Sequence, residues 1–87
     1  MKLILAIVRD SDADPVTQAL TSAEFRVTRV ASTGGLLRRG MTTLLIGLEA
    51  EQVESAIQLL HKTCKPASGS EKRATIFVIP VERFEQI

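Results

Sequence analysis

Three glycines and two arginines lie within residues 33–43, between two runs of residues that are typical of β-strands. Glycine adopts backbone dihedral angles that are closed to other residues, and it leaves neighbouring backbone N–H groups unshielded. Arginine donates paired hydrogen bonds to phosphate groups. The segment therefore has the chemistry of a loop that holds an anion such as phosphate. The alternative is a long hairpin connection, in which the glycines only shape turns and the arginines are solvated.

The strand predicted before this loop, over residues 25–32, adds two polar side chains. Because side chains alternate along a strand, Arg26 and Thr28 share one face. A guanidinium, a hydroxyl and free backbone amides could therefore converge on one phosphate. Burying an arginine without a counter-charge is costly, which favours a charged ligand or water beside Arg26.

Two other groups of residues contain metal-ligand types but do not complete a known site. Asp10, Asp12 and Asp14 resemble the start of a calcium-binding loop, yet the glycine and glutamate that such a loop needs do not follow. We expect these carboxylates to cap a helix, with Asp14 as the N-cap residue. His61 and Cys64 are too few for a zinc site, and we expect them at a solvated helix end. No metal site is predicted.

Composition and motifs argue against several classes of function. A net charge of +1 and the absence of tyrosine and tryptophan argue against nucleic-acid binding. We find no nucleophile–histidine arrangement, carboxylate pair, Walker motif or Rossmann fingerprint, so we expect neither an enzyme nor a bound cofactor. The apolar run of residues 3–8 is too short for a signal peptide or a membrane span, and a single cysteine fits a reducing compartment. We expect a cytoplasmic protein without a membrane partner.

Hydrophobic periodicity predicts one domain over residues 1–87. Continuous or alternating apolar runs predict strands, and apolar spacings of three and four predict helices. The predicted strands are residues 2–9, 25–32, 42–49 and 74–79, and the predicted helices are residues 15–24 and 50–63. The order β-α-β-β-α-β is that of an α+β ferredoxin-like sandwich, with two helices on one face of a four-stranded antiparallel sheet.

The first and last predicted strands are apolar on both faces, although two helices can cover only one face. In the first strand, Leu3 and Leu5 alternate with Ile4 and Ala6. Monomers seldom expose an apolar patch of this size, and burying each such side chain contributes about 1.5–3 kcal/mol. We therefore expect other copies of the chain to cover the helix-free face in a closed ring.

With this element order, five segments resemble the PII-like cyclic-di-AMP receptor family, relatives of the nitrogen-regulatory PII signalling proteins. They are residues 1–8, 25–28, 32–40, 42–47 and 74–86, and residues 33–43 and 77–81 match the patterns Thr-Gly-Gly-x-Leu-Arg-x-Gly-x-Thr-Thr and Phe-Val-x-Pro-Val. Members of this family are homotrimers that bind the dinucleotide in clefts between subunits. The resemblance implies a PII-like homotrimer with a small-molecule nucleotide as ligand, cyclic-di-AMP being the first candidate.

The resemblance also implies a set of ligand-binding residues. Arg26 and Thr28 would meet phosphate and sugar, Gly47 would permit close approach, and Gln86 would reach in from the C-terminus. The backbone of the connector, which is the glycine-rich loop of residues 33–43, would line the pocket at Gly34, Gly35, Leu36 and Leu37.

Three departures from the family concern the base-reading and partner-contacting parts of the protein. Met41 replaces an asparagine whose amide pairs with an adenine edge, so it offers the ligand apolar contact only. Leu36 replaces a phenylalanine, which removes a stacking surface for a base. The loop after the second helix, which contacts partners in PII-type proteins, is shortened to about residues 64–73.

We interpret the chain as a PII-like signal-transduction protein that binds a nucleotide second messenger between the subunits of a homotrimer and acts on an unknown downstream protein. Two alternatives stay open. One is a trimeric structural or interaction module with a degenerate pocket, and the other is an ATP- or ADP-binding regulator of the PII type.

Overall fold

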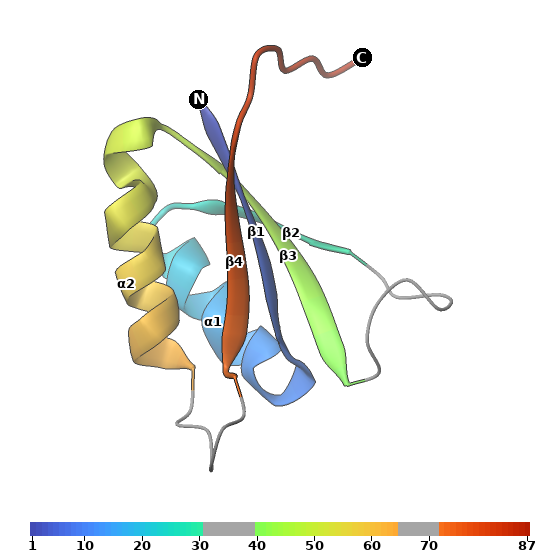
Figure 1. The fold of residues 1–87 in the computed structure, drawn as a ribbon, viewed down its shortest axis with the longest axis vertical. Coiled ribbons are helices and arrows are strands. Elements are labelled where there is room, and N and C mark those ends of the chain that lie inside the picture. Colours follow the sequence, from blue (N-terminus) through green and yellow to red (C-terminus); the bar gives the residue numbers. More distant parts are fainter. Residues whose placement is uncertain (31–39, 65–71) are drawn as a thin grey trace.

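The computed structural model describes residues 1–30, 40–64 and 72–87, and it has the predicted ferredoxin-like arrangement (Figure 1). Its strands form one antiparallel four-stranded sheet in the order β2-β3-β1-β4. The elements are β1 (Lys2–Arg9), α1 (Asp10–Ser22), β2 (Arg26–Val30), β3 (Met41–Leu48), the 3-10 turn η1 (Ala50–Gln52), α2 (Val53–Thr63) and β4 (Ala74–Pro80). The predicted α+β fold class is confirmed.

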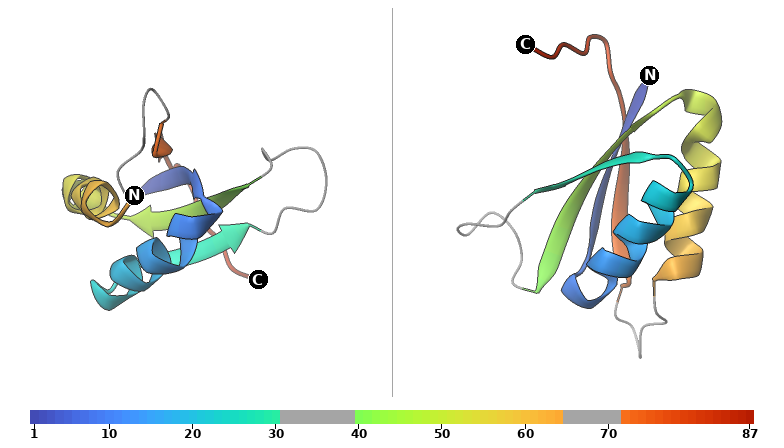
Figure 2. Two further views of the ribbon diagram at one scale, coloured as in Figure 1. Left: turned by 90° about the horizontal axis from the view of Figure 1, so that it is seen from below. Right: turned by 180° about the vertical axis from the view of Figure 1, so that it is seen from behind.

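Both helices lie on one face of the sheet and bury the side chains that point toward them (Figure 2). On β1 these are Ile4, Ala6 and Val8, and on β3 they are Leu44 and Ile46, all without solvent exposure. The helices contribute buried apolar side chains at the expected spacing, namely Val16, Leu20, Ala56 and Leu60. The alternation that predicted the strands thus also defines the core.

Helix α1 begins before the predicted start at Pro15, and the N-cap role predicted for Asp14 is wrong. The helix follows β1 directly, and Pro15 lies inside it. Asp12, in the first turn, is fully buried and forms an ion pair of 2.7 Å with Arg9, and acidic residues there also favour the helix dipole. Asp14 is exposed and pairs with Arg29 of β2. Helix α1 therefore starts earlier than predicted, and its first residues form ion pairs with Arg9 of β1 and Arg29 of β2.

The second predicted helix is confirmed, with a short 3-10 turn before it. Glu49 and Gln52 form a capping box, in which the Glu49 backbone N–H donates to the Gln52 side-chain oxygen at 2.9 Å. Helix α2 then continues to Thr63, the predicted end. Within the three described ranges, neither helix has the length and apolar character needed to cross a bilayer.

Neither α1 nor α2 covers the opposite face of the sheet, which keeps apolar side chains in contact with solvent (Figure 2). Leu3, Leu5 and Leu45 are half-buried there, whereas Phe77 and Ile79 of β4 are 52% and 39% exposed. These side chains are neighbours, because Leu5 pairs with both Leu45 and Phe77. The apolar helix-free face is present as expected, and its coverage by further copies of the chain stays a prediction.

Candidate functional site

A pocket of about 350 Å³ lies at the end of the sheet where the two chain termini meet. Its volume is near the lower end of the range for small-molecule sites. The strands contribute Lys2, Leu3, Arg26, Thr28, Leu45 and Gly47, and the chain ends contribute Met1, Val81, Phe84 and Gln86. Because it combines charged, polar and apolar side chains in one cavity, this pocket is the candidate functional site.

The strand register explains why these residues meet. Arg26 of β2 pairs with Gly47 of β3, which pairs in turn with Leu3 of β1. Thr28 pairs with Leu45, two residues farther along β2 and β3. Residues two apart on a strand point to the same face, so these side chains share the face that the helices leave open. The predicted placement of Arg26 and Thr28 on one face is confirmed.

Gly47 keeps the backbone of β3 open beside Arg26. A methyl group at this position would contact only the Met1 Cε atom, at 3.7 Å, which is an ordinary van der Waals distance. The strand itself therefore has room for alanine here. What glycine adds is free space above the backbone, and this is the room that the predicted close approach of a ligand at Gly47 requires.

The segment after β4 forms the remaining wall of the pocket. The Val81 backbone N–H donates to the Met1 carbonyl oxygen at 3.1 Å, which ties this segment to the start of β1. The chain then bends away from the direction of β4 (Figure 1), and Phe84 and Gln86 line the pocket. Gln86 thus lies at the same pocket as Arg26, on the segment from which it was expected to come.

The charged side chains of the pocket lining are cations. Lys2 and Arg26 belong to the lining, and none of the described residues adds a carboxylate side chain to it. Arg26 has no hydrogen bond or ion pair within residues 1–30, 40–64 and 72–87, whereas Arg29 on the other face of β2 lies 2.5 Å from the Asp14 carboxylate. The Arg26 guanidinium and the Thr28 hydroxyl both donate hydrogen bonds to anions, whereas the Lys2 side chain belongs to the face of Ile4 and Ala6, which the helices cover. The pocket has the chemistry of an anion site.

The structure brings some of the predicted site residues together and separates one from them. Arg26, Thr28, Gly47 and Gln86 line the pocket. Met41 opposes Arg9 at the far end of β3, roughly 20 Å along the strand from Gly47, and it is not part of the lining. The connector positions lie outside the described residues: Gly34, Gly35, Leu36 and Leu37. The ligand-binding roles of all these residues stay predictions.

Sequence reasoning missed two conspicuous members of the lining, Lys2 and Phe84. A signal for Phe84 was present, because residues two apart in an extended segment point the same way and Gln86 was already a candidate. Lys2 had no such signal. Its place in the lining depends on the pairing of β1 with β3 and β4, which a single sequence does not specify.

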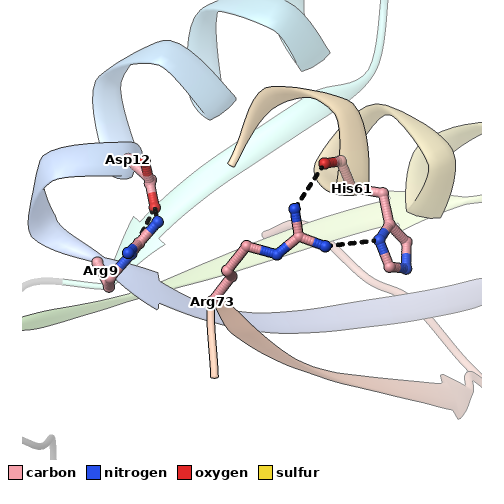
Figure 3. A network of polar contacts seen from close by, with 4 residues as sticks. All are labelled: Arg9, Asp12, His61 and Arg73. Carbon is pink, nitrogen blue, oxygen red and sulfur yellow. Dashed lines mark hydrogen bonds and ion pairs between the residues drawn. The ribbon is translucent and has the colours of Figure 1, made fainter. Parts of the chain in front are cut away.

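A second polar cluster lies at the other end of the sheet (Figure 3). Two nitrogens of the Arg9 guanidinium lie 2.7 and 2.8 Å from Asp12 Oδ2, and the Asp12 side chain is fully buried. Arg73 donates to the His61 carbonyl oxygen at 3.4 Å, and its Nη2 atom lies 3.2 Å from His61 Nδ1. The cations of this cluster are therefore held by groups of the protein itself, in contrast to Arg26.

Cys64 lies next to this cluster and is only 4% exposed, so the expected solvated helix end is wrong for Cys64, although His61 is exposed. Burial raises the pKa of the Cys64 thiol, and the nearby Asp12 carboxylate raises it further. Among the described residues, no three His, Cys, Asp or Glu side chains gather as metal ligands. The cluster belongs to the packed structure at this end of the sheet.

Comparison with known proteins agrees with the fold and identifies the family. The profile of the family described as "Cyclic-di-AMP receptor" matches residues 1–69. A crystal structure of a functionally unknown protein from Pediococcus pentosaceus ATCC 25745 is 32% identical to the chain, with a TM-score of 0.77. The alignment covers 99% of this chain and 96% of that one. The matched family profile extends over β1, α1, β2, β3 and α2, and the chain belongs to the cyclic-di-AMP receptor family.

Proposed function

We propose that this protein is a PII-like signal-transduction protein that binds a nucleotide second messenger, with cyclic-di-AMP as the first candidate, in clefts between the subunits of a homotrimer. The observation that carries the proposal is the pocket in which Arg26, Thr28, Gly47 and Gln86 meet. Membership of the cyclic-di-AMP receptor family supports the nature of the ligand.

A phosphodiester is the ligand group that fits the strand side of the pocket best. Each phosphodiester carries one negative charge and oxygen acceptors, and the wall offers the Arg26 guanidinium as a cation and the Thr28 hydroxyl as a donor. Gly47 leaves the backbone of β3 open to close approach. This lining fits a small anionic ligand better than a nucleic-acid polymer. A protein of net charge +1 attracts such a polymer only weakly.

The position of the pocket supports a site between subunits. It adjoins the helix-free face, where Phe77 and Ile79 are 52% and 39% exposed. A second copy packed on this face would bury those side chains and exclude water from the pocket, and charge interactions strengthen when water is excluded. A ligand that contacts two subunits would then favour the assembled state in which the C-terminal segment is ordered.

In the proposed role the protein binds and signals without catalysing a reaction, and it works in the cytoplasm, where a single reduced cysteine is stable. The ordered connector and C-terminal segment would be the surface that a downstream protein reads. Because the loop after α2 is short, the glycine-rich loop of residues 33–43 or the C-terminal segment would serve as the readout surface in its place.

A thermal-shift panel with cyclic-di-AMP, cyclic-di-GMP, ATP and ADP tests the proposal. A ligand present at a hundred times its dissociation constant stabilises the folded state by about 2.7 kcal/mol. We expect cyclic-di-AMP to raise the melting temperature most. A response to ATP or ADP alone would instead favour a PII-type adenine-nucleotide regulator, and no response to any of the four would leave a structural module of the same fold.

Sedimentation velocity tests the assembly separately. We expect a mass three times that of one chain, with and without ligand. A monomeric mass at micromolar concentration would contradict the homotrimer and the placement of the pocket between subunits.

A further inference from the structure

Phe84 is the one aromatic residue in the lining of the pocket. The sequence has three phenylalanines and no tyrosine or tryptophan. Phe25 is 9% exposed and belongs to the core, and Phe77 lies on β4 outside the pocket. Phe84 is 61% exposed, so much of its side chain is accessible to a ligand.

The polar and aromatic groups of the pocket come from different elements. Arg26 and Thr28 are on β2, whereas Phe84 and Gln86 are on the segment that follows β4. The pocket therefore has an anion-binding side, fixed by the sheet, and a flat apolar side with an amide beside it. A molecule that has both a phosphate and a planar heterocycle would satisfy both sides.

We propose that Phe84 is the base-stacking residue of this site, so that a purine base of the nucleotide lies against its ring while the phosphate contacts Arg26. This inference rests on the proposed function and deepens it. Base–aromatic stacking is tolerant of sequence and requires only an accessible ring face, which Phe84 has. The Gln86 amide has both a donor and an acceptor, so it can bond to the edge of the base that stacks two residues away.

Stacking on Phe84 would also couple the C-terminal segment to ligand binding. Within the described residues, the backbone hydrogen bond from Val81 to Met1 is the one that ties this segment to the strands, and it precedes Phe84. A bound base would add a contact on the far side of that bond. Inorganic phosphate, which has no base, should therefore bind weakly and leave the segment unchanged.

Two substitutions at one position test the inference by calorimetry with cyclic-di-AMP. Phe84→Leu keeps an apolar side chain but removes the ring, and we expect affinity to fall by about 5- to 150-fold, since stacking contributes about 1–3 kcal/mol per base. Phe84→Trp keeps a stacking surface, and we expect its affinity to stay close to that of the wild type. Phe84 lies outside the core, so both variants should melt like the wild type without ligand.

The Phe84→Trp variant also has a built-in optical readout, because it carries the only tryptophan of the chain. Its fluorescence should be quenched when cyclic-di-AMP binds and should not change with inorganic phosphate. Lys62→Trp is the matched control, since Lys62 is exposed in the last turn of α2, at the end of the molecule opposite to the pocket (Figure 1). Its fluorescence should not respond to the ligand.

The outcomes separate this inference from the proposed function. If the wild type binds cyclic-di-AMP, and Phe84→Leu binds equally well or Phe84→Trp is not quenched, the stacking role is wrong and the proposed function stands. If the wild type binds no nucleotide, both are wrong. Loss of binding in Phe84→Leu together with retention in Phe84→Trp supports both.

Discussion

Strand β2 carries one arginine on each face of the sheet, and the two have different surroundings. Arg29, on the helix side, lies 2.5 Å from the Asp14 carboxylate of α1. Arg26, on the helix-free side, has no carboxylate partner among the described residues and lines the pocket. Both residues are exposed arginines of the same strand, so they differ only in the groups that surround them on each face of the sheet. The helix face supplies its own counter-charge, and we propose that a ligand supplies it at Arg26.

The same contrast separates the two ends of the sheet. At the end with the polar cluster, Arg9 contacts the buried Asp12 carboxylate and Arg73 contacts His61. At the end with the pocket, Lys2 and Arg26 line a cavity of about 350 Å³. One end therefore contributes to stability, and we expect the other to contribute to binding. The following substitutions test this division.

The largest effect is expected at the paired end, where Asp12→Ala removes a buried carboxylate from its contact with Arg9. Breaking a buried ion pair on one side destabilises proteins by about 3–5 kcal/mol. Urea denaturation should show this loss, and Asp12→Asn, which keeps the shape of the side chain, should lose less. Asp14→Ala is the control, since exposed ion pairs contribute little. Equal stabilities of Asp12→Ala and Asp14→Ala would contradict the account of this end.

The next largest effect is expected on binding, where Arg26→Ala removes the guanidinium from the pocket. A hydrogen bond to a charged group contributes about 1.5–3 kcal/mol, which corresponds to roughly a 10- to 150-fold loss of affinity for cyclic-di-AMP in calorimetry. The trimer should persist in sedimentation. Arg29→Ala provides the matched control on the opposite face of β2, and its affinity should equal that of the wild type. An unchanged affinity of Arg26→Ala would exclude Arg26 from the site.

A smaller effect is expected for Gly47→Ala, which should weaken ligand binding without lowering the stability of the ligand-free protein. The added methyl occupies the space above β3 where the ligand would approach, and we expect a loss of about 1–2 kcal/mol in binding, near the cost of an extra methyl in a packed site. Without ligand the variant should be as stable as the wild type or slightly more so, because glycine in a strand is unfavourable relative to alanine. Reduced stability with unchanged binding would show that Gly47 serves the fold alone.

The smallest effect is expected at Cys64, and it depends on pH. Burial, and next the Asp12 carboxylate, raise the pKa of this thiol above its ordinary value of 9.0, so the folded state holds the proton more tightly than the unfolded state. The resulting stability is fully present below about pH 9 and is lost as pH rises through the folded pKa. The free energy of unfolding of the wild type should therefore decline more steeply above pH 9 than that of Cys64→Ala. Rapid labelling of Cys64 by iodoacetamide at pH 8 would contradict its burial.

Strand alternation and helical periodicity were sufficient to predict the architecture and the strand residues of the site. They predicted which side chains of β3 are buried, such as Leu44 and Ile46, and they placed Arg26 beside Thr28. These features depend on local geometry, which repeats every two residues in a strand and every three to four in a helix. The start of α1 was missed because Pro15 suits the first position of a helix, whereas the helix follows β1 directly and its first turn includes Asp12, which pairs with Arg9 three residues before it.

The remaining part of the site depends on contacts between distant segments. Phe84 and Arg26 are far apart in the chain and reach one pocket through the pairing of β2 with β3, β3 with β1 and β1 with β4, and through the hydrogen bond from Val81 to Met1. No local sequence pattern predicts that these residues line the same pocket. Gln86 could be named only because the C-terminal residues resemble those of a known family.

Arginine side-chain NMR during a titration with cyclic-di-AMP tests the central claim most directly, because it compares the two faces of β2 in one unmodified protein. The Nε–H resonance of Arg26 should shift and saturate as the ligand binds, while that of Arg29 stays in place beside Asp14. A shift of Arg29 without one of Arg26, or no shift of Arg26 at saturating ligand, would contradict the assignment of the pocket as the nucleotide site.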